Sequence, residues 1–268
     1  MPEVDVAGEF ETIRRLFAPL AHPEWGRGLT DDVAVVPSRP GHDLVLTKDA
    51  IVEGVHFLTT DPLDTVATPG PASFSMTLLG WTPKGRTVGR AGARPGDLVF
   101  VTGAIGDGWL GLEAVQGKLS LDAERVAVLS DHYRMPMPRT DFALPIRDLA
   151  TAAIDVSDGL IADLGHLAEA GQVRIEIDLE TVPLSAAGQA WFDGRVDEQA
   201  ALEKLVTGGD DYEIAFTATA RDEAALRREA ERRHLRLTRI GRVMAGQGVV
   251  ARFGGQPIAF DRPGFTHG

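Results

Sequence analysis

The sequence contains no cysteine, which excludes disulfide bonds, thiolate ligands for zinc and cysteine nucleophiles. It also has no stretch that approaches the ~20 apolar residues required by a membrane-spanning helix. The first ten residues, MPEVDVAGEF, are acidic and lack the apolar core of a secretory signal. We therefore expect a cytoplasmic protein without a membrane partner.

Basic residues are in the minority: 27 Lys and Arg face 39 Asp and Glu, for a formal net charge of −12. Nucleic acids and anionic membranes bind basic surfaces, so neither is an expected partner. An acidic protein still binds phosphates when divalent metal ions supply positive charge. The 268 residues suffice for one large domain or two of ordinary size.

Three oxygen-bearing side chains crowd into four positions: Asp155, Ser157 and Asp158. They precede a segment in which Leu160 and Leu164 recur at helical spacing, which predicts a helix with one buried face. One such residue is enough to cap the first helical turn. The crowding of carboxylates also suits a hard divalent cation such as Mg2+. Capping and metal binding both remain open at this point.

The N-terminal half has acids beside two predicted strands. Asp31 and Asp32 lead into the β-branched run 33–36, and a strand over 43–48 ends at Asp49. Acids at such strand ends meet at one rim of a sheet, although ordinary loop chemistry explains them equally well. A further strand is predicted over 73–81, with one buried face, because small or polar residues alternate with apolar ones.

A strand over 97–102 runs into the glycine turn 103–108 and then into a helix. Backbone amides in such a turn can cradle phosphate. The spacing matches neither the dinucleotide fingerprint nor the Walker loop, so this signal is weak by itself. A second glycine turn, 207–213, is rich in acids and precedes a strand.

Helices and strands alternate in the second half, which predicts an α/β or α+β fold. The expected helices are 159–170, 185–192, 197–205 and 222–233, and the expected strands are 173–178, 212–218 and 236–243. A helix is also expected over 8–20. The proline-punctuated connector 132–139 suggests two domains, 1–138 and 139–268.

Eight stretches resemble the thiamine-monophosphate kinase family, within the aminoimidazole-ribonucleotide-synthetase-like superfamily. In chain order they are TDDVAVV (30–36), LTKDAIVEGVHF (46–57), GRAGARPGDLVFVTGAIGD (89–107), the connector 132–139, AIDVSDGLIADLGHLAEA (153–170), TGGDDYEIAF (207–216), IGRVMAGQGV (240–249) and PGF (263–265). They follow the family's order and cover most of the chain, so together they are highly specific.

The resemblance implies ATP-dependent phosphorylation of thiamine phosphate to thiamine diphosphate, with several Mg2+ ions. It also implies an N-terminal nucleotide-binding α/β domain with a mixed sheet, a C-terminal α/β domain, and a homodimer that pairs through the N-terminal sheets. No covalent nucleophile is expected, because an oxygen of the acceptor phosphate attacks directly.

The resemblance assigns three groups of residues. The metal ligands would be Asp32, Thr47, Asp49, Asp64, Asp155 and Asp158. Asp64, Arg90 and Ser157 would contact ATP. His56, Asp210 and Phe265 would face thiamine phosphate.

Three departures from the family pattern stand out. Lys48 occupies a position where the family usually has Thr, and Asp210 replaces a usual Glu. A long family segment is missing between Leu58 and Ser73, so Asp64 could belong to either side of the junction. Because that segment supplies core elements, we expect the polypeptide to contain further residues there; a true deletion would leave the metal cluster incomplete.

Three other functions compete with the kinase. A selenophosphate synthetase typically uses an N-terminal cysteine or selenocysteine, which this chain lacks. Other ATP-dependent synthetases of the superfamily fit TGGDDYE and PGF less well. The alternative from another class is a non-catalytic protein that binds nucleotide or thiamine phosphate.

Overall fold

The computed structural model describes residues 38–52 and 73–264, together with Arg15 and Pro19. The chain divides into two compact units: residues 1–56 with 68–85, and residues 57–67 with 86–268. Apart from Arg15 and Pro19, the helix expected over 8–20 lies outside the described residues. In the described ranges, no helix is both long and apolar enough to cross a membrane.

The described part of the first unit is a β-hairpin. Strand β1 (His42–Val52) pairs antiparallel with β2 (Ser73–Pro83), in a register that runs from His42 opposite Pro83 to Val52 opposite Ser73. Both predicted strands are confirmed. The expectation of a buried face on β2 is wrong: Met76 and Leu78 are 60% and 53% exposed. The reason is that no other described element of this unit packs on the hairpin.

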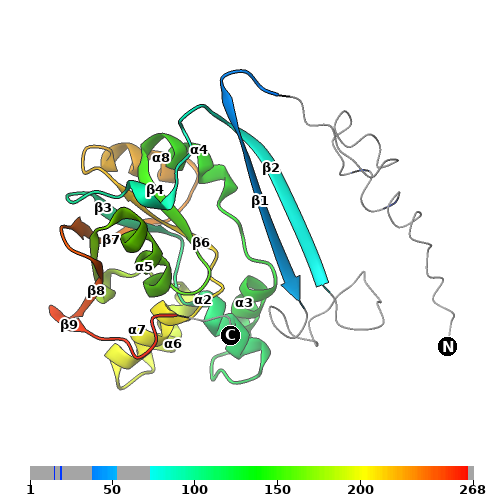
Figure 1. The fold of residues 1–268 in the computed structure, drawn as a ribbon. Coiled ribbons are helices and arrows are strands. Elements are labelled where there is room, and N and C mark those ends of the chain that lie inside the picture. Colours follow the sequence, from blue (N-terminus) through cyan, green and yellow to red (C-terminus); the bar gives the residue numbers. More distant parts are fainter. Residues whose placement is uncertain (1–14, 16–18, 20–37, 53–72, 265–268) are drawn as a thin grey trace. The chain divides into compact units, whose positions relative to one another are not determined.

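The second unit is built on a seven-stranded mixed sheet in the order β4-β6-β3-β7-β5-β8-β9 (Figure 1). Neighbouring strands are antiparallel except for β5 and β8, which run parallel. The strands are β3 (Leu98–Thr102), β4 (Ala150–Val156), β5 (Arg174–Asp178), β6 (Glu213–Ala218), β7 (Leu237–Met244), β8 (Gly248–Phe253) and β9 (Gln256–Ile258).

Helices cover this sheet and one of its ends. They are α2 (Asp107–Val115), α3 (Ala123–Arg134), α4 (Ala143–Leu149), α5 (Leu160–Gly171), α6 (Ala186–Asp193), α7 (Glu198–Thr207) and α8 (Glu223–Arg232), with short 3-10 turns η4 (Arg90–Gly92), η5 (Thr140–Phe142) and η6 (Leu179–Thr181). The helices and strands predicted for the second half are confirmed to within a few residues. Helices α3 and α4 were not predicted.

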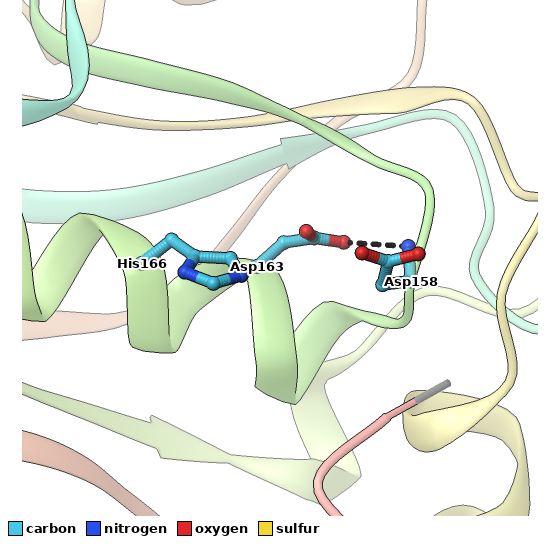
Figure 2. Close-up of side chains that lie close together, drawn as sticks. All are labelled: Asp158, Asp163 and His166. Atoms are coloured by element: carbon cyan, nitrogen blue, oxygen red, sulfur yellow. Dashed lines mark hydrogen bonds between the residues drawn. The ribbon is translucent and has the colours of Figure 1, made fainter. Parts of the chain in front are cut away.

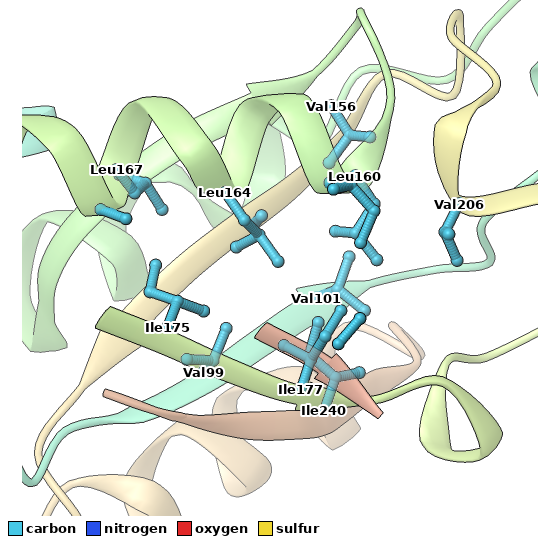
Figure 3. Close-up of a cluster of buried hydrophobic side chains, with 14 of the residues drawn as sticks. Val99, Val101, Val156, Leu160, Leu164, Leu167, Ile175, Ile177, Val206 and Ile240 are labelled. Atoms are coloured by element: carbon cyan, nitrogen blue, oxygen red, sulfur yellow. The ribbon is translucent and has the colours of Figure 1, made fainter. Parts of the chain in front are cut away.

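Helix α5 packs on one face of the sheet (Figure 3). Leu160, Leu164 and Leu167 are fully buried against strand residues such as Val99 and Ile175. Burying one such side chain contributes about 1.5–3 kcal/mol, so the leucine periodicity fixes the helix to the sheet. The buried face predicted from the leucine spacing is confirmed.

The opposite face of the sheet carries a second core. Phe100 and Phe216 stack with their ring centroids 5.4 Å apart, and they share a cluster with residues of α4 and α8. Side chains on neighbouring antiparallel strands face one another across this pair. With helices on both faces of a mixed sheet, the expected α/β fold class is confirmed.

The stretch 86–138 belongs to the second unit. Strand β3 lies inside the sheet, between β6 and β7, and α2 packs against α3. The sequence pattern placed a domain boundary at residue 138, whereas the two units divide near Gly85. The connector 132–139 is tied to the sheet by Arg139, whose Nε donates to the buried Glu213 carboxylate at 2.7 Å.

A buried carboxylate organises the turn after β3. Asp211 is 1% exposed, and its Oδ1 accepts hydrogen bonds from the amides of Gly106 (3.0 Å) and Gly108 (2.9 Å). Burial raises the pKa of Asp211, and the two amides oppose that rise. The sequence suggests that this turn could bind phosphate through its backbone amides. The amides of Gly106 and Gly108 donate instead to the side chain of Asp211.

This arrangement predicts that Asp211→Asn destabilises the fold. Oδ2 of Asp211 also accepts from Gly106 N, at 2.9 Å. An NH2 group in place of Oδ2 would face that backbone N–H with a second donor, and an unsatisfied buried donor costs about 1–3 kcal/mol. Urea unfolding followed by circular dichroism measures the change. Asp197→Asn is the matched control, because Asp197 caps α7 through Ala200 N and Asn caps equally well. Equal stability of the two variants would contradict the role given to Asp211.

Candidate functional site

Two polar loops meet at one end of the sheet. The first, residues 155–159, contains the end of β4, and the second, residues 207–212, leads into β6. Strands β4 and β6 are antiparallel partners, with Val156 opposite Glu213. The end of one strand and the start of the other therefore lie side by side. This pairing brings Asp155, Ser157 and Asp158 next to Asp210.

Backbone contacts join the two loops. The amide of Asp210 donates to the carbonyl of Ser157, and that of Tyr212 donates to the carbonyl of Val156, both at 2.8 Å. A Cβ atom on Gly209 would lie 2.4 Å from the Ser157 carbonyl oxygen. Only glycine permits this approach, which explains the glycine at that position.

Asp155, Ser157 and Asp158 do not cap helix α5. The N-cap residue is Gly159, with φ of +116° and no side-chain cap, and a left-handed backbone there favours glycine. The amides of Ser157 and Asp158 donate instead to Oδ2 of Asp163, at 3.0 and 3.1 Å. The capping alternative thus fails for these three side chains, which leaves metal binding open.

Negative charge accumulates around Asp163, which is 2% exposed. Burial raises the pKa of Asp163 to about 6; the two backbone amides oppose the rise, and the charges of Asp158 and Asp155 add to it. Among the described residues, no cationic side chain contributes to this shift. A cation bound near these three carboxylates would relieve their mutual repulsion.

Asp210 is held in an unusual backbone conformation. Its φ is +67°, that of Tyr212 is +52°, and such values are uncommon for residues other than glycine. The Tyr212 hydroxyl donates to Oδ1 of Asp210 at 3.0 Å. The backbone of Asp210 lies beside the first loop, hydrogen-bonded to Ser157.

Two further segments reach this region. The carbonyl of Gly89 accepts a hydrogen bond from Ala153 N at 3.1 Å, which places Arg90 next to β4. Near the C-terminus, Gly264 packs so closely that a Cβ atom there would lie 2.4 Å from the carbonyl oxygen of Asp158. Phe265 follows it directly in the sequence and lies outside the described residues.

Thr47 and Asp49 belong to the first unit, on strand β1. They are two residues apart, so they share one face of the strand, and Lys48 lies on the other. Oδ1 of Asp49 accepts a hydrogen bond from Ala50 N at 2.7 Å. Asp32, His56 and Asp64 are expected site residues outside the described residues.

Two residues of the site were not expected from the sequence. Asp163 supports the first loop, and His166 lies one helical turn further along α5, close to both Asp158 and Asp163 (Figure 2). The only signal was the pair itself, an Asp and a His three residues apart on one face of a helix.

Residues 94–254 match a family described as AIR synthase related protein, C-terminal domain. The thiamine-monophosphate kinase of Caulobacter vibrioides is 37% identical over 322 aligned positions, which cover 97% of this chain and 91% of that protein. The thiamine-monophosphate kinase of Escherichia coli K12 is 34% identical, over 82% of this chain and 67% of that protein.

The alignment with the Caulobacter vibrioides protein has 322 positions and this chain has 268 residues, so at least 54 positions (322 less 268) have no residue here. The chain is continuous between Leu58 and Ser73. The expectation of further residues at that junction is therefore wrong for this chain.

Solved structures agree with the sequence relatives. A thiamine-monophosphate kinase from Stenotrophomonas maltophilia superposes with a TM-score of 0.75 and 29% identity, over 90% of this chain and 94% of that chain. AaThiL complexed with AMPPCP and TMP superposes with a TM-score of 0.69 and 27% identity, over 97% of each chain. This chain belongs to the thiamine-monophosphate kinase family.

Proposed function

We propose that this protein transfers a phosphoryl group from ATP to thiamine phosphate, which yields thiamine diphosphate. The observation that carries the proposal is the first loop. Its oxygen-bearing side chains, Asp155, Ser157 and Asp158, are not used as helix caps, while Asp163 holds the backbone of the loop in place. The related AaThiL has been solved with AMPPCP and TMP, and AMPPCP is an analogue of ATP.

Mg2+ fits the donors of this loop, because carboxylates and a hydroxyl are the hard oxygen ligands that it prefers. When bound, Mg2+ neutralises phosphate charge and orients the reacting groups. Asp155 and Asp158 are the proposed ligands in the second unit. The further proposed ligands are Asp32, Thr47, Asp49 and Asp64.

The chain's own residues would position the two anions. Arg90, beside β4, and Ser157 are the proposed contacts to ATP, together with Asp64. Asp210, His56 and Phe265 are the proposed contacts to thiamine phosphate. An aromatic ring near a cationic thiazolium contributes ~0.5–2 kcal/mol. A phosphate oxygen of the acceptor attacks directly, so no protein nucleophile is part of the mechanism.

A non-catalytic binding protein is the second candidate, favoured by the aligned positions that have no residue here. Such a protein would keep the first loop and bind its ligands without turnover. Another ATP-dependent synthetase of the superfamily would turn over ATP with a different acceptor. ATP, the phosphoryl donor, is a cytoplasmic metabolite, so the location that accompanies the kinase proposal is the cytoplasm.

We also propose a homodimer, formed through one face of the hairpin. Leu44 and Leu46 on β1 lie opposite Trp81 and Leu79 on β2, so these four side chains share a face. Leu46 is 63% exposed. An isolated two-stranded hairpin is marginally stable, and burying this apolar face against a second copy would stabilise it. Thr47 and Asp49 point to the other face and would stay available for ligands.

Asp158→Asn should weaken the binding of ATP at millimolar Mg2+ by at least ~10-fold, which corresponds to about 1.4 kcal/mol. The change removes a charged metal ligand and keeps the shape of the side chain. Isothermal titration calorimetry at several Mg2+ concentrations measures it. Asp178→Asn, at an exposed aspartate of the same unit, is the control. An Asp158→Asn protein with unchanged affinity at every Mg2+ concentration would refute the metal role.

Thiamine phosphate should be phosphorylated faster than thiamine. A neutral hydroxyl acceptor would need a general base as well as charge neutralisation, whereas a phosphate oxygen does not. A coupled ADP-release assay with each acceptor, ATP and Mg2+ measures both rates. Faster turnover of thiamine would overturn the assignment. Saturable binding with no turnover of either acceptor would favour the non-catalytic candidate.

The proposed interface predicts that Leu46→Glu converts a dimer into a monomer. Burying a glutamate without a partner would cost far more than the leucine contributes. Sedimentation velocity should show the wild-type protein at twice 28.7 kDa and the variant at 28.7 kDa. Leu144→Glu is the control, because Leu144 is an exposed leucine of the second unit. A dimeric Leu46→Glu protein would exclude this face as the interface.

A further inference from the structure

Asp158, Asp163 and His166 bring three possible ligand atoms together (Figure 2). One carboxylate oxygen from each aspartate and one imidazole nitrogen lie within 4.8 Å of one another. Asp163 is buried, Asp158 is half-buried and His166 is exposed. The group therefore has a fixed inner side and an outer side that is open to solvent.

The backbone holds two of these ligands in a defined position. Asp163 and His166 are three residues apart on α5, a spacing that places both on the same side of a helix. The amides of Ser157 and Asp158 donate to Oδ2 of Asp163, which fixes that carboxylate against the loop. Both of these hydrogen bonds fall on Oδ2, so Oδ1 is the oxygen with capacity for a further ligand.

Direct pairing between the imidazole and the carboxylates does not explain the cluster. In Figure 2 the single hydrogen bond among the three residues joins the amide of Asp158 to Asp163. Ligands bound at about 2.1 Å to a tetrahedral ion lie about 3.4 Å apart. The three ligand atoms lie within 4.8 Å of one another, so small side-chain rotations would have to bring them closer on binding.

The nitrogen ligand determines the kind of ion. Mg2+ takes oxygen ligands almost exclusively, whereas imidazole with carboxylates suits transition metals such as Zn2+ and Co2+. We propose that Asp158, Asp163 and His166 form a site for a divalent transition metal that is occupied without nucleotide. The site shares Asp158 with the proposed kinase centre, in which Asp163 supports the loop and His166 has no assigned role.

The test uses the full chain without nucleotide. Co2+ should bind with one ion per chain and give visible d–d absorption, and Zn2+ should displace it. His166→Asn should weaken Zn2+ binding at least ~10-fold, as expected for the loss of a ligand. His234→Asn is the matched control, because His234 is an exposed histidine of the same unit.

Two results would overturn the proposal: no Co2+ absorption and no Zn2+ binding by the wild-type chain, or equal Zn2+ affinities for the wild type and His166→Asn. Asp163→Asn is not used as the main variant, because Asp163 also supports the loop. Since no ATP is present, failure of this test says nothing against the kinase. Conversely, Co2+ binding by a chain without kinase activity would uphold this site alone.

Discussion

The geometry of the site depends on the hydrogen bonds that the buried Asp211 carboxylate accepts from Gly106 and Gly108. This side chain joins the turn after β3 to the loop before β6, two segments that are about a hundred residues apart in the sequence. Its neighbours on either side, Asp210 and Tyr212, have left-handed backbone conformations. Such conformations persist only where surrounding contacts impose them. Asp211 therefore adds to the backbone hydrogen bonds from Asp210 and Tyr212 to Ser157 and Val156, which hold Asp210 beside the first loop.

Asp163 supports the first loop as Asp211 supports the turn after β3. Each is a buried aspartate whose carboxylate accepts two backbone amides, and each lies close to less buried acids. A buried charge is costly unless such hydrogen bonds satisfy it. Asp211 and Oδ2 of Asp163 thus accept structural hydrogen bonds from the backbone. Crowded carboxylates at this end of the sheet reflect two roles, one structural and one chemical.

The sequence predicts the features that depend on neighbouring residues, but not those that depend on long-range packing. The leucine spacing of α5 identified its buried face, because periodicity is local. Residues 155–158 are predicted as a ligand group for the same reason, since they are adjacent in the sequence. Asp210 and Asp211, in contrast, are identical neighbours, and only the packing of β3 against β6 determines which of them is buried. Helix α3 has a single fully buried residue, Leu129, so its apolar pattern was too weak to predict it.

Side chains alternate between the two faces of the hairpin, so each face carries a different set of residues. In the register observed, Leu44 and Leu46 share a face with Leu79 and Trp81, while Thr47 and Asp49 lie on the other face with Met76 and Leu78. Shifting one strand by a single residue would mix the two sets, because every side chain would change sides. The register is therefore under two constraints at once. The face proposed for the dimer and the face with the proposed oxygen ligands both require the same pairing of β1 with β2.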